Sequence, residues 1–262
     1  MTSIPPPKPP DGHGLLEGKV VVVTAAAGTG IGNAVAERCL AESAHVVLSD
    51  SHERRLAEAR DRLSETYGKK VWSLPCDVTD EDAVRALVNG AVSAHGRLDV
   101  MINNAGLGGN RPVTEMTDEE WSRVLDVTLN GTFRCTRAAL TQMIAQGGGG
   151  VVVNNASVLG WRAQAGQAHY AAAKAGVMAL TRCAAVEAAE FGVRVNAVAP
   201  SLALHANLAK VTSDELLAEL TAREAFGRAA QPWEVANAIV FLASGYSSYL
   251  TGEVVSVSSQ HP

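Results

Sequence analysis

Tyr170 and Lys174 have the side chains and the spacing for proton transfer. They stand four positions apart in the alanine-rich stretch HYAAAKAG, residues 169–176, so on a helix they share one face about a turn apart. A free tyrosine titrates near pH 10, and lowering its pKa to about 7 takes roughly 4 kcal/mol. An ammonium about 4 Å away supplies roughly that amount at an effective dielectric constant of about 20. The pair is therefore predicted to move a proton, the alternative being an ordinary pair on a surface helix.

Ser157 is the third candidate catalytic residue. It follows a predicted strand in NNASVLG, thirteen residues before Tyr170, and its hydroxyl is able to hydrogen-bond a substrate carbonyl or hydroxyl. A serine, a tyrosine and a lysine that converge beside a nucleotide site would form a hydride-transfer centre.

The rest of the chain must position these residues, and from Lys19 onward it alternates short apolar runs with amphipathic stretches. Apolar runs of this kind are typical of parallel strands covered on both faces. Strands are predicted at Val20–Thr24, His45–Ser49, Val71–Leu74, Val100–Asn103, Val151–Asn154, Val193–Val198 and Val254–Val257, and helices near 30–42, 53–66, 80–94, 118–146, 167–190 and 233–243. Asp80 and Asp118 are the predicted N-caps, and Gly68, Gly96 and Gly192 are predicted near helix C-termini.

This alternation predicts the α/β class, with residues 15–262 forming one Rossmann-type domain around a doubly wound parallel sheet of about seven strands. Residues 1–14 are rich in proline and are predicted to be a disordered or surface-laid tail. In such a sheet the ligand lies outside the carboxyl ends of the strands, where the crossover direction reverses.

The loop after the first strand is the predicted phosphate site. Its sequence, TAAAGTGIG, places Gly28, Gly30 and Gly32 directly before a helix, so that a pyrophosphate can approach the N–H groups of the helix N-terminus. Thr24 and Ile31 of the same loop are predicted to contact the cofactor. Further cofactor contacts are predicted after the third, fourth and sixth strands, at Asp77, Val78, Asn104, Ala105, Gly106 and Pro200.

Asp50 ends the second predicted strand and favours NAD as the cofactor. Its carboxylate is placed to accept hydrogen bonds from the adenosine ribose, and it would repel a 2′-phosphate. Arg54 and Arg55 are near enough in sequence to bind such a phosphate, so NADP stays open. Asp50 could instead form a capping box with Glu53 at the start of the next helix.

From about Leu16 onward the chain resembles the short-chain dehydrogenase/reductase family. The resemblance rests on the glycine-rich loop, on Asn103–Gly106, and on Ser157, Tyr170 and Lys174 in the spacing Ser-x12-Tyr-x3-Lys. It implies an NAD(P)-dependent oxidoreductase that acts on CH–OH groups. It further implies that Tyr170 is the general acid or base, that Lys174 lowers its pKa and holds the nicotinamide ribose, and that Ser157 positions the reacting oxygen.

The chain departs from the family pattern in three ways. Ala25 stands where the family usually has the first glycine of the loop, and the loop is one residue longer than in the family. Both differences imply a reshaped phosphate loop. Thr128 stands where the family has a catalytic asparagine, which puts its water relay in doubt. Ser201 and His205 replace a glycine and a threonine that holds the carboxamide, which implies altered anchoring of the nicotinamide.

Residues 202–225 are interpreted as a substrate lid. The segment carries Leu202, Leu204, Leu208, Leu216, Leu217 and Leu220, and with Trp161 it indicates a bulky apolar alcohol or ketone. Helix packing would explain the leucines equally well. The chain also resembles a narrower group of bacterial reductases of steroid-ring breakdown, which implies a fused-ring acyl-CoA thioester as substrate. Arg111, Arg162, Lys210 and Arg223 are then candidates for the CoA phosphates, or else ordinary surface charges.

Two other functions remain open. A 3-oxoacyl-thioester reductase of fatty-acid synthesis would use NADPH, against which Asp50 argues. A dinucleotide-sensing protein without turnover would need no catalytic residues, but Ser157, Tyr170 and Lys174 are all present.

The composition and charge of the chain indicate which kinds of binding partner to expect. The net charge is −5 and no long basic cluster exists, which argues against nucleic acid. No apolar run is long enough to span a membrane, and without a leader the four cysteines are expected to be buried thiols in the cytoplasm. The histidines show no ligand spacing, so no metal is expected. Small residues on the helices 118–146 and 167–190, such as Ala171, Ala173, Ala184 and Ala188, predict association into a tetramer or at least a dimer.

Overall fold

The computed structural model describes residues 4–204 and 214–260, in which seven strands form one parallel sheet. The strand order is β3-β2-β1-β4-β5-β6-β7, so the crossover direction reverses between β1 and β4. The strands are β1 (Val20–Val23), β2 (His45–Asp50), β3 (Val71–Pro75), β4 (Val100–Asn103), β5 (Gly150–Asn155), β6 (Val193–Pro200) and β7 (Val254–Val257). The predicted Rossmann-type fold is confirmed, and the five inner strands are buried over most of their length, as strands covered on both faces must be.

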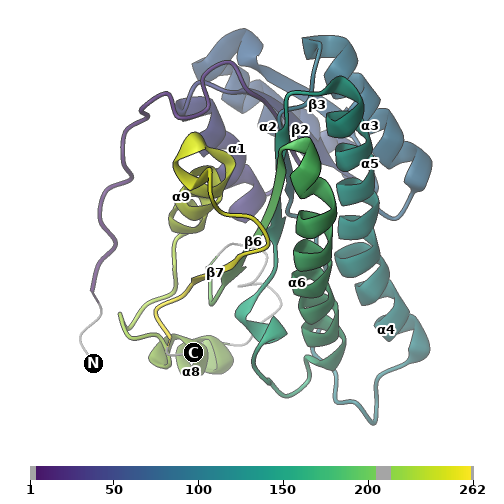
Figure 1. Ribbon diagram of the computed structural model, residues 1–262. Coiled ribbons are helices and arrows are strands. Elements are labelled where there is room, and N and C mark those ends of the chain that lie inside the picture. Colours follow the sequence, from purple (N-terminus) through teal and green to yellow (C-terminus); the bar gives the residue numbers. More distant parts are fainter. Residues whose placement is uncertain (1–3, 205–213, 261–262) are drawn as a thin grey trace.

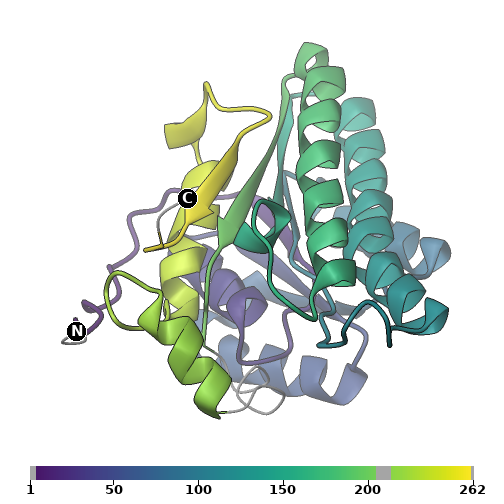
Figure 2. The ribbon, with the colours of Figure 1, turned by 90° about the horizontal axis from the view of Figure 1, so that it is seen from below.

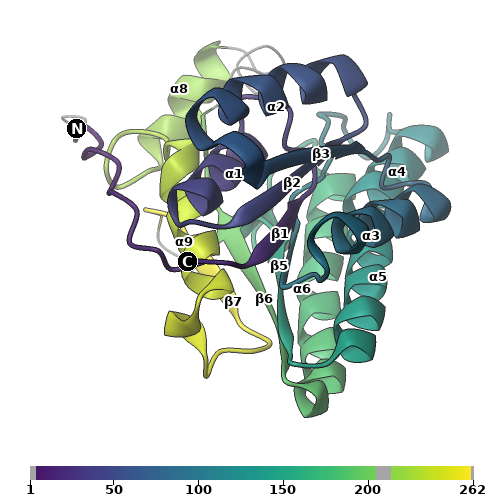
Figure 3. The same ribbon diagram turned by 90° about the horizontal axis from the view of Figure 1, so that it is seen from above.

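Helices cover both faces of the sheet, as Figures 1 and 3 show. One face packs against α1 (Ile31–Ala41), α2 (Glu53–Tyr67) and α9 (Pro232–Ala243). The other face packs against α3 (Glu81–His95), α5 (Gly131–Gln146) and α6 (Ala168–Ala188). Two further helices, α4 (Asp118–Leu125) and α8 (Asp214–Ala222), lie at the lower end of the molecule in Figure 1.

At the helix starts, one predicted N-cap is confirmed and another is corrected. Asp80 caps α3 as predicted, accepting hydrogen bonds from the backbone N–H groups of Asp82 and Ala83. Asp118 is not an N-cap, because Thr117 and Glu120 form a capping box one residue earlier.

The alternative role considered for Asp50, a capping box with Glu53, is not found. The N-cap of α2 is His52, and the Asp50 carboxylate accepts hydrogen bonds from the backbone of His52 at 2.9 Å and of Ala27 at 3.2 Å. Asp50 therefore joins the glycine-rich loop to the end of β2, a role that leaves it at the edge of the sheet.

The stretch predicted as one helix over 118–146 is interrupted in its middle. A π-helical segment, Asp126–Asn130, separates α4 from α5 and contains the buried Thr128. Segments of this kind are rare and frequently occur at functional sites.

A line of buried polar side chains crosses the sheet between α5 and α6. Asn103 donates hydrogen bonds to Thr136 at 3.0 Å and to Asn154 at 2.8 Å, and Asn154 donates to Thr181 at 2.9 Å. Since the sheet pairs Asn103 directly with Asn154, the amides cross-link neighbouring strands as well as both helices.

The described part of the tail, residues 4–14, runs along the surface. His13 and Leu15 donate backbone hydrogen bonds to the buried carboxylate of Glu42, at 2.8 and 3.0 Å. Ile4 donates to the backbone oxygen of Phe226 at 3.0 Å, so the tail lies against the segment that follows α8 (Figure 2).

Two surface predictions need correction. Cys39, Cys76 and Cys135 are buried, but Cys183 is exposed because it lies on the outer side of α6. Ala173, Ala184 and Ala188 are buried within the protomer, so they do not offer a surface for another subunit. None of the helices in the described ranges is long and apolar enough to cross a membrane.

Candidate active site

A cleft of about 1720 Å³ lies at the carboxyl ends of the strands and gathers nearly all of the predicted site residues. Of these residues only Thr24 does not line the cleft, because it is buried beneath the glycine-rich loop. The predicted residues that do line it are Gly28, Gly30, Ile31, Gly32, Asp50, Asp77, Val78, Asn104, Ala105, Gly106, Ser157, Tyr170, Lys174 and Pro200.

Thr24 and Asn104 hold the glycine-rich loop in place. The Thr24 hydroxyl accepts hydrogen bonds from the backbone of Asn104 at 2.9 Å and of Ala105 at 3.0 Å. The Asn104 amide returns hydrogen bonds to the backbone oxygens of Thr24 and Ala25 at 3.2 and 3.3 Å. The loop after β1 and the loop after β4 are therefore one hydrogen-bonded unit.

The loop has the backbone of a dinucleotide cradle. Ala25, at the position where the family has glycine, adopts a φ of 51°, a left-handed conformation that favours glycine. A Cβ added at Gly32 would lie 2.3 Å from the Ala25 backbone oxygen, so that position admits only glycine. Gly30 caps α1 without a side-chain hydrogen bond, which leaves the N–H groups of the helix N-terminus for an anion.

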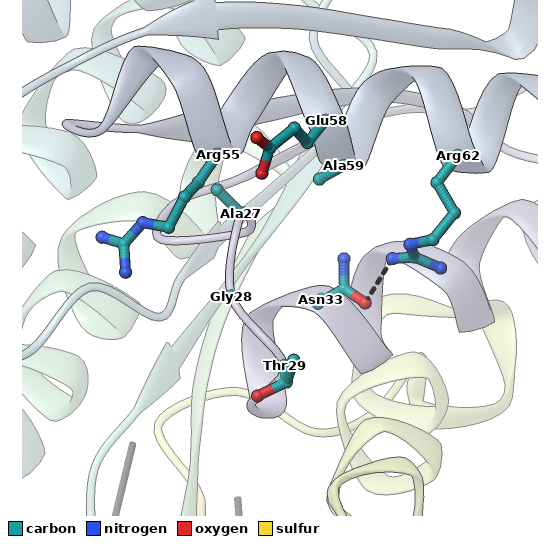
Figure 4. A pocket seen from close by; sticks show the side chains of 8 residues that line it. All are labelled: Ala27, Gly28, Thr29, Asn33, Arg55, Glu58, Ala59 and Arg62. Carbon is teal, nitrogen blue, oxygen red and sulfur yellow. Dashed lines mark hydrogen bonds between the residues drawn. The ribbon is translucent and has the colours of Figure 1, made fainter. Parts of the chain in front are cut away.

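Beside Asp50 the surface is basic. A smaller pocket of about 430 Å³ lies between the glycine-rich loop and α2, and Figure 4 shows the residues that line it. Arg62 donates a hydrogen bond to Asn33 at 2.8 Å. The side chain of Arg55 extends away from Arg62 and Asn33, and Arg55 also lines the large cleft. Arg54 is exposed and pairs with Glu58 at 3.2 Å. Of the two arginines considered for a 2′-phosphate, Arg55 is thus the one at the cleft.

Ser157, Tyr170 and Lys174 meet on the opposite side of the cleft. Ser157 and Tyr170 both line this side of the cleft, and Ser157 acts on the Tyr170 hydroxyl as a hydrogen-bond partner that lowers its pKa. Lys174 is 3% exposed and donates a hydrogen bond to the backbone oxygen of Asn155, and its Nζ atom lies 5.5 Å from the centroid of the Tyr170 ring. The first turns of α6 therefore present both side chains to the serine at the end of β5.

The pKa values of Tyr170 and Lys174 differ from those expected from the sequence. Burial raises the pKa of Tyr170 to about 12, and only the hydrogen bond with Ser157 lowers it. Burial also lowers the pKa of Lys174 to about 8. The predicted depression of the tyrosine pKa by the lysine is thus wrong for the protein alone, because desolvation outweighs any attraction between the two groups.

Thr128 takes part in a contact that the sequence did not indicate. Its hydroxyl accepts a hydrogen bond from the backbone N–H of Leu107 at 2.9 Å and donates one to the backbone oxygen of the same residue at 3.0 Å. Its own backbone oxygen accepts a hydrogen bond from the Thr132 hydroxyl at 2.8 Å. The threonine therefore fixes the loop after β4 beside Gly106 and Lys174.

The far end of the cleft carries the predicted lid. Ser201, Leu202, Leu216 and Leu220 line it, together with Arg162 and Arg223. Leu204 and Trp161 are largely exposed and do not line the cleft, and Arg111 pairs with Glu120 at 3.1 Å outside it. His205, Leu208 and Lys210 lie outside the described residues.

No cluster of three or more metal-ligating side chains occurs in residues 4–204 and 214–260.

Comparisons with known proteins extend over nearly the whole chain. Residues 25–259 match a family model described as enoyl-(acyl carrier protein) reductase. A Mycobacterium tuberculosis protein named (5R,7aS)-5-hydroxy-7a-methyl-1-oxo-2,3,5,6,7,7a-hexahydro-1H-indene-carboxyl-CoA reductase is 65% identical over 256 residues, 98% of each chain. A cis-4-hydroxycyclohexanecarboxylate dehydrogenase from Sinomonas cyclohexanicum is 42% identical over 91% of this chain and 94% of its own.

Two further similarities come from a more distant relative and from a solved structure. A 3-oxoacyl-(acyl-carrier-protein) reductase, FabG, from Staphylococcus aureus is 35% identical over 92% of this chain and 96% of its own. The crystal structure of a short chain dehydrogenase from Mycobacterium smegmatis superimposes with a TM-score of 0.88, at 61% identity and with 98% of each chain covered.

Proposed function

This chain belongs to the short-chain dehydrogenase/reductase family and is an oxidoreductase, and we propose that it transfers a hydride between NAD and the ring ketone or alcohol of a fused-ring acyl-CoA. The observation that carries the proposal is that Ser157, Tyr170 and Lys174 line the same cleft as the uncapped N-terminus of α1.

The residues present fit a dinucleotide. The N-terminus of α1 would hold the pyrophosphate, and Gly32 leaves the space that a Cβ would fill. Asp50 would accept hydrogen bonds from the adenosine ribose, and Lys174 would hold the nicotinamide ribose. The nicotinamide supplies or accepts the hydride when it is bound.

Tyr170 is the proposed acid and base. A pKa of about 12 keeps its hydroxyl protonated at neutral pH, which suits it to donate a proton to the oxygen of a ketone that is being reduced. Ser157 would hold the same oxygen by a hydrogen bond. In the reverse direction Tyr170 must lose its proton first, and the positive charge of Lys174, together with that of an oxidised nicotinamide, would favour the tyrosinate.

The substrate class is inferred from the most similar of the named relatives. A reductase for a hexahydroindene-carboxyl-CoA shares 65% of its residues with this chain, against 35% for the 3-oxoacyl reductase of fatty-acid type. Leu202, Leu216 and Leu220 supply an apolar wall at the lid, as a fused-ring substrate needs.

The cofactor preference rests on Asp50. The carboxylate is fixed by backbone N–H groups of Ala27 and His52, so it cannot swing away from a 2′-phosphate without losing both hydrogen bonds. Arg55 lines the same cleft and opposes this preference. We propose NAD because the fixed charge repels the additional phosphate directly.

Association through the outer helices is proposed on different residues from those first considered. Phe133 and Ile144 on α5 and Val186 on α6 are exposed apolar side chains, which a second subunit would cover. A dimer or tetramer is expected in light scattering, and a monomer at micromolar concentration would contradict this.

The function is tested by following the absorbance of reduced nicotinamide with NAD or NADP. The panel holds a fused-ring hydroxyacyl-CoA, its free acid, a linear 3-hydroxyacyl-CoA and a simple steroid alcohol. Turnover of the ring thioester with NAD, lost in Tyr170→Phe but kept in Tyr246→Phe, is the expected result, because Tyr246 is exposed and remote from the cleft.

Other outcomes would replace the proposal. Turnover of the linear thioester alone, or with NADP alone, would assign the protein to fatty-acyl metabolism. Binding of NAD without turnover of any substrate would indicate a dinucleotide-sensing protein. Activity unchanged in Tyr170→Phe would refute the proposed mechanism.

A further inference from the structure

Beneath the lid, a buried carboxylate joins three separate parts of the chain. Glu224 is 2% exposed and follows α8. It accepts hydrogen bonds from the backbone of Leu202 at 3.3 Å, from the Ser259 hydroxyl at 2.7 Å and from the Gln260 amide at 2.8 Å. Both flanks of the lid are therefore attached to residues 259–260.

Gln260 also contacts Arg162 and so connects it to Glu224. Its amide nitrogen donates to Glu224, and its amide oxygen accepts a hydrogen bond from the Arg162 guanidinium. Because a carboxylate needs a donor and a guanidinium needs an acceptor, the amide can adopt only this orientation. Gln260 thus fixes the guanidinium from one side, while Glu224 fixes Gln260.

Arg162 lies at the cleft and close to Ser157 in the sequence. It follows Ser157 by five positions, and its backbone N–H donates to the Val158 oxygen at 3.0 Å at the end of the 3₁₀ turn Val158–Gly160. Its side chain lines the cleft together with Gln260, Leu202 and Leu220. It therefore stands between the proposed catalytic serine and the proposed lid.

The other arginines at this end differ from Arg162. Arg223 also lines the cleft, but its side chain is exposed and pairs with Glu219 one turn earlier. Arg111 pairs with Glu120 and does not line the cleft. Among the described arginines first considered for the CoA phosphates, Arg162 is the one joined through Gln260 to the buried Glu224.

We propose that Arg162 determines specificity by binding an oxygen of the substrate's carboxyl-derived group, and that Gln260 is the positioning residue that aims it. The inference rests on the proposed function, since it assigns the recognition of the acyl end of that substrate. The ligand chemistry is a carboxylate or a thioester carbonyl oxygen, both of which accept hydrogen bonds from a guanidinium.

The test compares substrates within each carbon skeleton. For the fused-ring skeleton and for a linear skeleton, kcat and KM are measured with the acyl-CoA, with the free acid and with the ketone that lacks the carboxyl-derived group. Arg162→Met is expected to raise KM by about tenfold or more for the acyl-bearing substrates and to leave kcat/KM for the plain ketones unchanged. The free acid and the thioester distinguish a carboxylate from a carbonyl as the group bound.

Three variants make the test specific. Gln260→Leu, which keeps most of the side-chain volume, is expected to raise the same KM values by a smaller factor without changing kcat. Arg162→Lys should restore part of the selectivity, because it keeps the charge but not the fork of donors. Arg85→Met is the control, because Arg85 pairs with Glu81 at 3.1 Å and does not line the cleft, and its selectivity is expected to equal that of the wild type.

Calorimetric binding of the free acids to the enzyme–NADH complex keeps the two proposals separate, since it needs no turnover. Weaker binding in Arg162→Met, with unchanged affinity for NADH, would support the role of Arg162 even if the fused-ring substrate proved wrong. Equal binding of the acids to wild type and Arg162→Met, or an equal loss in Arg85→Met, would overturn it.

Discussion

The Nζ atom of Lys174 lies over the ring of Tyr170, 5.5 Å from its centroid. Both side chains belong to the first turns of α6, and burial governs both pKa values. The lysine pKa is low and the tyrosine pKa is high, so in the free protein each group resists ionisation. Bound cofactor is what would change this balance, because it adds charge beside both groups.

The buried lysine makes stability depend on alkaline pH. Its pKa is 10.5 in the unfolded chain and about 8 when folded, so between these values the unfolded chain holds a proton that the folded protein has released. Stability contributed by this group therefore rises with pH in that window, by about 3 kcal/mol. Lys174→Met should lack the rise, as measured by urea unfolding from pH 7 to pH 10.5.

Lys69→Met is the control, because Lys69 is exposed in the turn after α2. Taking differences from wild type cancels the contributions of Tyr170 and the buried cysteines. Equal pH dependence in wild type and Lys174→Met would show that the lysine pKa is not lowered.

Gly32→Ala should weaken cofactor binding. The new Cβ would lie 2.3 Å from the Ala25 oxygen and 2.4 Å from the Asn104 amide nitrogen, which would break the hydrogen bonds between the two loops. We expect the Kd for NADH, measured by fluorescence, to rise by about tenfold or more. Gly245→Ala is the matched control, since nothing lies within 4 Å of a Cβ at that position. Unchanged affinity in Gly32→Ala would refute the phosphate cradle.

Asp50→Asn tests the cofactor preference by charge alone. The asparagine oxygen can still accept a hydrogen bond from the backbone of Ala27 or His52, but the negative charge is lost. The ratio of kcat/KM with NAD to kcat/KM with NADP should fall by about tenfold. Asp61→Asn, on the exposed side of α2, should leave the ratio unchanged. If the ratio in Asp50→Asn equals that of wild type, the cofactor preference is set by other residues, and Arg55 is the first one to test.

Thr128→Val removes a hydroxyl at constant shape. The backbone N–H and oxygen of Leu107 both lose their partner, which should lower the free energy of unfolding by about 1–3 kcal/mol. Activity should fall as well, because the loop lies next to Gly106 and Lys174. Thr114→Val, at an exposed loop position, should change neither. The measurements are chemical denaturation and the hydride-transfer assay, and wild-type stability in Thr128→Val would contradict the structural role.

The strands were predictable to within two residues because nearly every one of their side chains is apolar, a local property of the sequence. Ser157, Tyr170 and Lys174 were predicted from their residue types, their spacing, the position of Ser157 after a strand and the family resemblance, and the structure does place them together. Helix starts were less predictable, since Thr117 and Asp118 are both good caps and only the capping box with Glu120 decides between them.

Other features depend on contacts between distant residues. The π-helical segment at Thr128 is fixed by its bond to Leu107, twenty-one positions away. The contact of Gln260 with Arg162 spans ninety-eight positions. The pKa values of Tyr170 and Lys174 were wrongly anticipated because a charge pair can be seen in a sequence, whereas burial cannot.

The buried amides of Asn103 and Asn154 bear on how the sheet assembles. Valine runs such as those of β1 and β5 hardly distinguish one register from another, since a slip by two residues keeps every side chain on its face. Such a slip between β4 and β5 would separate the two amides, and each polar group left without a partner costs about 1–3 kcal/mol. The asparagines thus stabilise the observed register of β4 and β5 over shifted registers that the valines alone would hardly distinguish.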